Sequence, residues 1–337
     1  MQKYGRRMIG MGDRNASPSA FGWDFQVNAA ILLMLENIRE ADKVRVEGAD
    51  EDIEITLKDK TKIYSQVKSV IKQDDFSNIN EKLTAALETL NLDSLNGDGS
   101  RFTYTTNSPN PFNNQKTMGA FTGRTHLDFD ELPDVCQQKI QNILTNKRYS
   151  HFDTSLMDVR VIPFYGRDLK NRYKEIQACV GEFLMELRIP SEGISSEILH
   201  IWQRDFFQNA TQPDTAVSID KKQMIWPLIV LLVEQTAAND YRKDFDDDEC
   251  LEIERKYKAI INQQTMLYEF FTNVITDHNR SKKPLKSFVT DNWKDYLFAI
   301  ENVNADLETK ESLIKIILYK ILTQRRCIND IKRRVNL

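Results

Sequence analysis

Acidic, amide and basic side chains in residues 20–70 have the types and spacing that phosphodiester chemistry needs. Asp52 opens one short apolar segment, and Gln66 and Lys68 stand two positions apart in the next. Hydrolysis of a phosphodiester uses a metal that polarises the phosphoryl oxygen and activates a water. Mg²⁺ prefers carboxylate and carbonyl oxygens, and a lysine steadies the developing negative charge. A carboxylate followed by Gln-x-Lys therefore points to a metal-dependent phosphodiesterase.

Short strands must position these side chains. The alternation of apolar residues predicts strands at 43–47, 52–57 and 62–68, with Asp59-Lys60 as a tight turn between the last two. Gln66 and Lys68 then share one face of their strand, and the turn brings that face beside Asp52. Glu47 lies just before this hairpin and is a candidate second metal ligand. The apolar pattern from Phe25 to Arg39 predicts a helix, from which Gln26 could point into the same cleft.

A simpler interpretation has to be weighed against this site. A carboxylate and a lysine on adjacent strands are more often an exposed cross-strand pair. Two observations favour the functional interpretation. The strand that contains Gln66 and Lys68 should be central. Burial of a lysine there costs free energy, so its presence suggests a function. The helix with Gln26 also precedes the strands at the expected place.

The same residues carry a resemblance to a known family. The ordered set comprises Phe21-Gly22-Trp23-Asp24-Phe25-Gln26, then Glu47 and Asp52, then Gln66-Val67-Lys68, and later Phe102-Thr103-Tyr104-Thr105-Thr106-Asn107. It resembles the PD-(D/E)xK restriction-like nucleases in their QxK variant. More closely, it is similar to the nuclease domain shared by anti-phage proteins, namely the SAVED-domain effectors of CBASS, the Lamassu nuclease subunit and the HerA-associated nucleases. The resemblance covers about residues 5–165.

The resemblance implies a role for each matching residue. Asp52 takes the metal-binding acidic role, Gln66 the place of the usual motif acid, and Lys68 the role of the catalytic lysine. Because Gln66 lacks a charge, the metal needs another carboxylate, for which Glu47 is the candidate and Asp50 and Glu54 are rivals. Gln26 matches as a supporting residue. The implied cofactor is Mg²⁺, with Mn²⁺ as the alternative.

The pattern of elements predicts two domains behind a flexible arm. We expect an arm at 1–19, an α/β restriction-endonuclease-like domain at 20–165 with a mixed sheet flanked by helices, and an all-α domain at 166–337 for partner binding and oligomerisation. Further elements of the first domain are a helix at 78–92, a strand at 101–106, a helix near 131–145 and a strand at 157–162. Helices are predicted at 168–188, 194–209, 221–240, 249–277, 284–302 and 309–334.

Composition limits the partners and the compartment. The net charge of −4 argues against a chain that binds nucleic acid tightly by itself, because such affinity rests on Lys and Arg. The four cysteines are scattered with no CxxC pair, so we expect neither a zinc site nor disulfides, and a reducing cytoplasm. The longest apolar run, Met224 to Val233, is too short to span a bilayer and predicts a buried helix.

The sequence thus predicts a Mg²⁺-dependent DNA endonuclease that serves as an anti-phage effector. The resemblance implies double-stranded DNA as substrate, a partner ATPase of the SMC-like or HerA-like kind, a third small subunit as a further candidate, and self-association when active. The C-terminal half shows no cyclic-nucleotide sensor pattern, which favours a nuclease subunit controlled by another protein. The resemblance implies a Lamassu-like subunit, with the nuclease partner of a HerA-type translocase as the alternative. Two alternatives stay open: a non-catalytic assembly subunit with a degenerate nuclease domain, and RNA as the substrate.

Overall fold

The structure is a computed structural model that describes residues 17–49, 51–95, 100–168, 171–190, 192–236, 266–301 and 303–337. These residues form two compact units. The first takes its described residues from Met1–Ala30, Val46–Glu54 and Thr61–Glu175, and the second from Ile31–Arg45, Ile55–Lys60 and Ile176–Leu337. The predicted domain limits stay a prediction.

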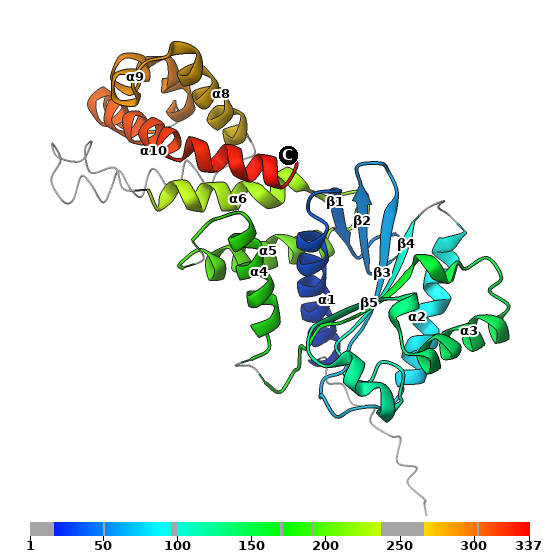
Figure 1. The fold of residues 1–337 in the computed structure, drawn as a ribbon. Helices are drawn as coiled ribbons and strands as arrows, with labels where there is room; N and C mark the ends of the chain where they lie inside the picture. The colour runs from blue at the N-terminus through cyan, green and yellow to red at the C-terminus, as the bar shows by residue number, and fades with distance from the viewer. Residues whose placement is uncertain are drawn as a thin grey trace, which may run out of the picture. The chain divides into compact units, whose positions relative to one another are not determined.

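A mixed seven-stranded sheet in the order β5-β6-β4-β3-β2-β1-β7 confirms the predicted α/β fold class (Figure 1). β3 pairs in parallel with β4, and β4 with β6, whereas β5 runs antiparallel to β6 and β7 antiparallel to β1. The strands are β1 (Ala41–Val46), β2 (Ile53–Leu57), β3 (Lys62–Lys68), β4 (Arg101–Thr106), β5 (Thr125–Asp128), β6 (Met157–Val161) and β7 (Ile219–Asp220). The short strands β5 and β7 were not predicted.

An apolar core covers one face of β3, β4 and β6. Tyr64, Tyr104 and Val159 alternate with polar neighbours along their strands, so their side chains share this face. Helices α2 (Ile79–Ser94) and α3 (Asp134–Lys147) supply Leu83, Leu87 and Ile140 to the same core. Figure 1 shows both helices on this side of the sheet. Burial of this face fixes the strand register, and therefore the positions of the polar residues at the strand ends.

Helix α1 (Ser17–Glu36) begins eight residues before the predicted start at Phe25. Pro18 explains the early start, because proline suits the first turn of a helix. Residues 17–19 are therefore helical and not part of an arm; the rest of the predicted arm lies outside the described residues.

The second unit confirms the predicted helical C-terminal region. Trp226 packs edge-on against Phe271 with ring centroids 4.7 Å apart, and the apolar run from Met224 to Val233 is buried except at Pro227. Its α-helices are α4 (Lys174–Glu186), α5 (Ser195–Ala210), α6 (Lys221–Glu234), α8 (Met266–Ser281), α9 (Leu285–Asn292) and α10 (Leu307–Arg334). Helix α4 begins two residues before the unit, and a 3₁₀ helix at Trp293–Ile300 follows α9. The predicted helix at 249–277 is described only from residue 266.

Asn107, directly after β4, joins three chain segments at the carboxyl ends of the parallel strands. Its Oδ1 accepts a hydrogen bond from Val70 N at 2.7 Å, and its Nδ2 donates to Val70 O at 2.7 Å and to Phe164 O. The side chain is fully buried. The amide thus satisfies backbone groups that the ends of β3 and β6 leave unpaired.

We expect Asn107→Ala to destabilise the protein by about 2–3 kcal/mol, because it leaves buried backbone groups without partners. Chemical denaturation of the purified protein measures this change. Asn142→Ala, at an exposed position of α3, is the matched control and should change the free energy of unfolding by less than about 0.5 kcal/mol. Equal stabilities of the two variants would show that Asn107 does not hold these segments together.

Candidate functional site

The first half of α1 is anchored near the carboxyl end of β6. The rings of Phe21 and Phe25 lie 5.6 and 5.5 Å from the ring of Phe164. Asp24 accepts hydrogen bonds from Arg172 Nη1 at 3.1 Å and from the Tyr173 hydroxyl at 2.8 Å. These contacts give the aromatic and acidic residues of the N-terminal motif a positioning role.

Gln26, on the same helix, holds the backbone beside the predicted metal ligand. Its Nε2 donates a hydrogen bond to the Asp52 carbonyl oxygen at 2.8 Å, and the side chain is buried. The backbone N of Glu47 donates to the same oxygen, also at 2.8 Å. Gln26 therefore positions Asp52 through its main chain.

The carboxylate of Asp52 meets Gln66, Val67 and Lys68 at the end of β3. Its Oδ2 accepts hydrogen bonds from Gln66 Nε2 and from Val67 N, the latter at 2.8 Å, and lies 3.9 Å from Lys68 Nζ. The side chains of Asp52 and Lys68 are 25% and 26% exposed, so solvent or a substrate can reach both. The structure brings together the carboxylate, the amide and the lysine that the sequence singled out.

The candidates for a second acidic ligand have different surroundings. Glu54 forms a salt bridge with Lys62, with Oε2 and Nζ 3.1 Å apart. This carboxylate therefore already has a cationic partner. Glu47 has a left-handed φ of 53° in the turn before β2, and its backbone bond to Asp52 keeps the two residues adjacent. Asp50 lies outside the described residues. Of the two described residues, Glu47 remains the candidate.

Glu51 forms a buried acid pair with Asp93 that the sequence did not predict. The two side chains are 4% and 3% exposed, and Glu51 Oε2 accepts a hydrogen bond from Asp52 N at 3.2 Å. Burial, followed by the hydrogen bond and charge of Asp93, raises the pKa of Glu51 to about 10. At neutral pH the Glu51–Asp93 pair therefore keeps a proton, and the pair holds the residue next to Asp52 against α2.

Lys82 brings a second cation into the neighbourhood of Lys68. Its Nζ donates a hydrogen bond to Ser69 O at 2.7 Å. Burial lowers the pKa of Lys82, with the positive charge of Lys68 as a further cause and Asp75 acting in the opposite direction. Nothing in the spacing of residues 78–92 distinguishes this lysine, because its position depends on how α2 returns over β3.

A cavity of about 800 Å³ lies at the carboxyl ends of β4 and β6, lined among others by Pro109, Val161 and Tyr165. The segment after Lys68 contributes Gln73 and Asp74 to its wall. Ligands of open α/β sheets bind beyond the carboxyl ends of the strands. Asp52, Gln66 and Lys68 do not line this cavity, so it can accommodate part of a substrate but does not enclose the candidate reaction centre.

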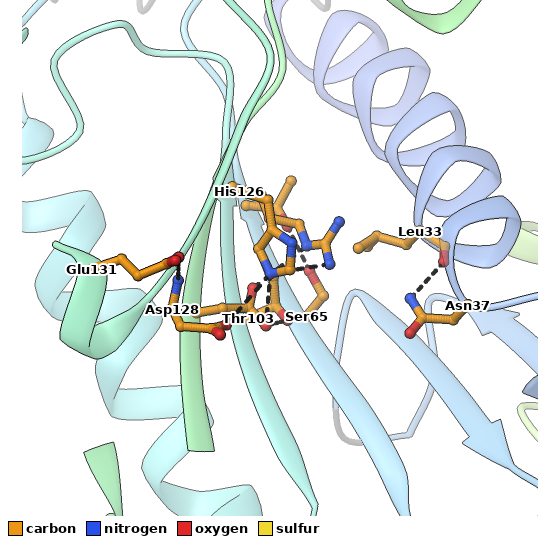
Figure 2. Close-up of polar contacts among 10 residues, drawn as sticks. Leu33, Asn37, Ser65, Thr103, His126, Asp128 and Glu131 are labelled. Atoms are coloured by element: carbon orange, nitrogen blue, oxygen red, sulfur yellow. Dashed lines mark hydrogen bonds and ion pairs between the residues drawn. The ribbon is translucent and has the colours of Figure 1, made fainter. Parts of the chain in front are cut away.

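A separate cluster of two carboxylates and a histidine lies on β5 and β6. The Nε2 atom of His126 is 3.7 Å from Asp128 Oδ1 and 3.7 Å from Asp158 Oδ2. Figure 2 shows His126 and Asp128 beside Thr103 on the sheet, and Thr103 Oγ1 donates to Asp158 Oδ2 at 3.1 Å. Sequence reasoning missed this cluster because β5 was not predicted.

Comparison of the chain with models of protein families, with curated proteins and with solved structures found no match. In the described part of the chain, no helix is long and apolar enough to cross a membrane.

The Glu51–Asp93 pair predicts a pH-dependent stability. Because the folded pKa of Glu51 is raised above its ordinary 4.5, the folded protein holds a proton that the unfolded chain releases. The stabilisation is complete below about pH 4.5 and is lost as the pH rises toward 10. We expect Glu51→Gln to reduce the fall in melting temperature between pH 5 and pH 9, while the exposed control Glu88→Gln leaves it unchanged. Parallel pH profiles for all three proteins would contradict the shared proton.

Proposed function

We propose that the chain is a metal-dependent phosphodiesterase that cuts DNA, with Asp52, Gln66 and Lys68 at its centre. The supporting observation is the convergence of the three side chains, with the Asp52 carboxylate 3.9 Å from the Lys68 ammonium. A plain cross-strand ion pair needs neither the Gln66 amide nor the Val67 N–H on the same oxygen. These extra donors fix the orientation of the carboxylate, as a reaction centre requires.

The donor atoms fit a hard divalent cation. All the contacts of the Asp52 carboxylate with described residues go to Oδ2, which leaves Oδ1 available. The Gln66 amide, whose Nε2 donates to Asp52, has its Oε1 as a further possible ligand, and Glu47 is the candidate for a further carboxylate. Mg²⁺ or Mn²⁺, when bound, would polarise a phosphoryl oxygen and lower the pKa of a water.

The other residues orient the centre and balance its charge. Lys68, beside Asp52, is placed to steady negative charge that develops on the phosphate. Gln26 and the Val67 N–H keep Asp52 in place through its carbonyl and its carboxylate. Lys82, near Lys68, adds positive charge that favours a phosphate backbone.

Control by other proteins follows from charge and from the resemblance. A chain with a net charge of −4 has weak affinity for DNA unless a partner or self-association supplies contacts. We propose that the helical C-terminal region provides these, as an oligomerisation surface and as the contact with an SMC-like ATPase in a Lamassu-like complex. A HerA-like ATPase is the alternative partner.

Cleavage of supercoiled plasmid with Mg²⁺ or Mn²⁺ tests the proposal. We expect Lys68→Ala and Asp52→Asn each to lower the cleavage rate by about 100-fold or more, because each removes charge that acts on the phosphate or the metal. Lys72→Ala, an exposed lysine four residues beyond Lys68, is the matched control and should retain near-normal activity.

Two outcomes would contradict this assignment. Equal cleavage by the Lys68→Ala and wild-type proteins would place the chemistry elsewhere. Absence of metal-dependent cleavage of DNA and of RNA, across protein concentrations that include the self-associated form, would favour a non-catalytic assembly subunit. A substrate panel of duplex DNA, single-stranded DNA and RNA identifies the preferred nucleic acid.

A further inference from the structure

The register of β5 against β6 gathers four charged or titratable side chains on one face of the sheet. His126 lies opposite Arg160, and Asp128 lies opposite Asp158. Alternation along each strand places all four on the same side. Two carboxylates directly opposite each other on antiparallel strands repel and destabilise the pair, so this arrangement calls for a positive charge between them.

The distances within the cluster suit metal coordination better than hydrogen bonding. The gap of 3.7 Å from His126 Nε2 to each carboxylate oxygen is too long for a hydrogen bond. Two ligands of one tetrahedral metal, with bonds of about 2.0–2.2 Å, lie about 3.3–3.6 Å apart. One ligand atom from each of His126, Asp128 and Asp158 falls within 4.8 Å of the other two.

Asp158 supplies an independent sign of a ligand. It is 6% exposed, and its Oδ1 is buried without a hydrogen bond to any described residue. Its Oδ2 faces His126 Nε2 and is oriented by the Thr103 hydroxyl. A hydrogen bond from a neighbouring side chain, such as this one from Thr103, commonly orients a carboxylate that binds a metal. A buried carboxylate oxygen that accepts no hydrogen bond is costly unless a cation compensates it, and in the structure Arg160 Nε lies 3.4 Å from Asp158 Oδ1.

Arg160 is the competing explanation for the cluster. Its Nε lies 3.4 Å from Asp158 Oδ1, and its Nη2 donates a hydrogen bond to His126 Nε2 at 3.3 Å, which a metal bound at Nε2 would have to replace. One guanidinium balances one carboxylate, whereas Asp128 and Asp158 carry two charges and the Glu131 carboxylate accepts a hydrogen bond from Asp128 N at 3.1 Å. With His126 neutral, as a metal ligand must be, the cluster keeps net negative charge after Arg160 is counted.

We propose that His126, Asp128 and Asp158 bind one transition-metal dication of the Zn²⁺ or Mn²⁺ class, which fastens the edge strand β5 to β6. The mixed set of one imidazole nitrogen and two carboxylate oxygens favours these ions over Mg²⁺, which prefers oxygen alone. Two ligands come from β5 and one from β6, so the ion links the strands and offsets the repulsion between the carboxylates. This site is separate from Asp52 and independent of nuclease activity.

Calorimetric titration with ZnCl₂ and MnCl₂ tests the site, in an Asp52→Asn background that weakens the proposed catalytic site. We expect one equivalent of ion to bind and to raise the melting temperature. Asp128→Asn should weaken binding by at least about tenfold, and His126→Ala should do the same. Asp128 is 74% exposed, so its replacement should not prevent folding.

Asp130→Asn is the matched control, because it removes the same charge from an exposed position two residues away. It should bind the ion as the parent protein does. The proposal is overturned if neither ion binds saturably, or if Asp128→Asn and Asp130→Asn bind equally well. In either case Arg160 and a protonated His126 balance the two carboxylates without an ion.

Discussion

The hydrogen bonds from β3 to the Asp52 carboxylate are the interaction on which the proposed site depends. Asp52 precedes β2, and its Oδ2 is fixed by the Gln66 amide and the Val67 N–H on β3. The same contacts bring the carboxylate to 3.9 Å from Lys68 Nζ. Gln26 fixes the carbonyl of Asp52 from α1. A carboxylate held on both its main chain and its side chain loses little freedom when it binds a cation, which is how a protein prepares a reaction centre.

Buried polar groups at the strand ends support this arrangement. Asn107 closes the carboxyl ends of β3, β4 and β6 through three hydrogen bonds. The protonated Glu51–Asp93 pair holds the residue before Asp52 against α2. Such groups are costly to bury alone, so each keeps its partner and thereby restricts the local backbone. The proposed reaction centre therefore rests on a polar network at the edge of an otherwise apolar domain core.

Local patterns in the sequence predict the helices and strands that have regular periodicity. They also predict which site residues lie close together on neighbouring strands. β3 and β4 coincide with their predicted ranges, and Gln66 and Lys68 meet Asp52 as their spacing indicates. The sequence does not reveal β5 and β7, because strands of four and two residues carry too little alternation. Two further contacts, the Glu51–Asp93 pair and the proximity of Lys82 to Lys68, depend on how α2 packs. A short segment of sequence does not predict that packing. The His126 cluster was missed because β5, which carries His126 and Asp128, was not predicted.

We propose that Asp52 holds a divalent cation beside Lys68 for phosphodiester hydrolysis. Anomalous diffraction from crystals of the Lys68→Ala protein with Mn²⁺ and a DNA duplex tests it most directly. We expect a Mn²⁺ peak within coordination distance of the Asp52 carboxylate and of a phosphate oxygen. A duplex bound elsewhere with no Mn²⁺ at Asp52 would contradict it.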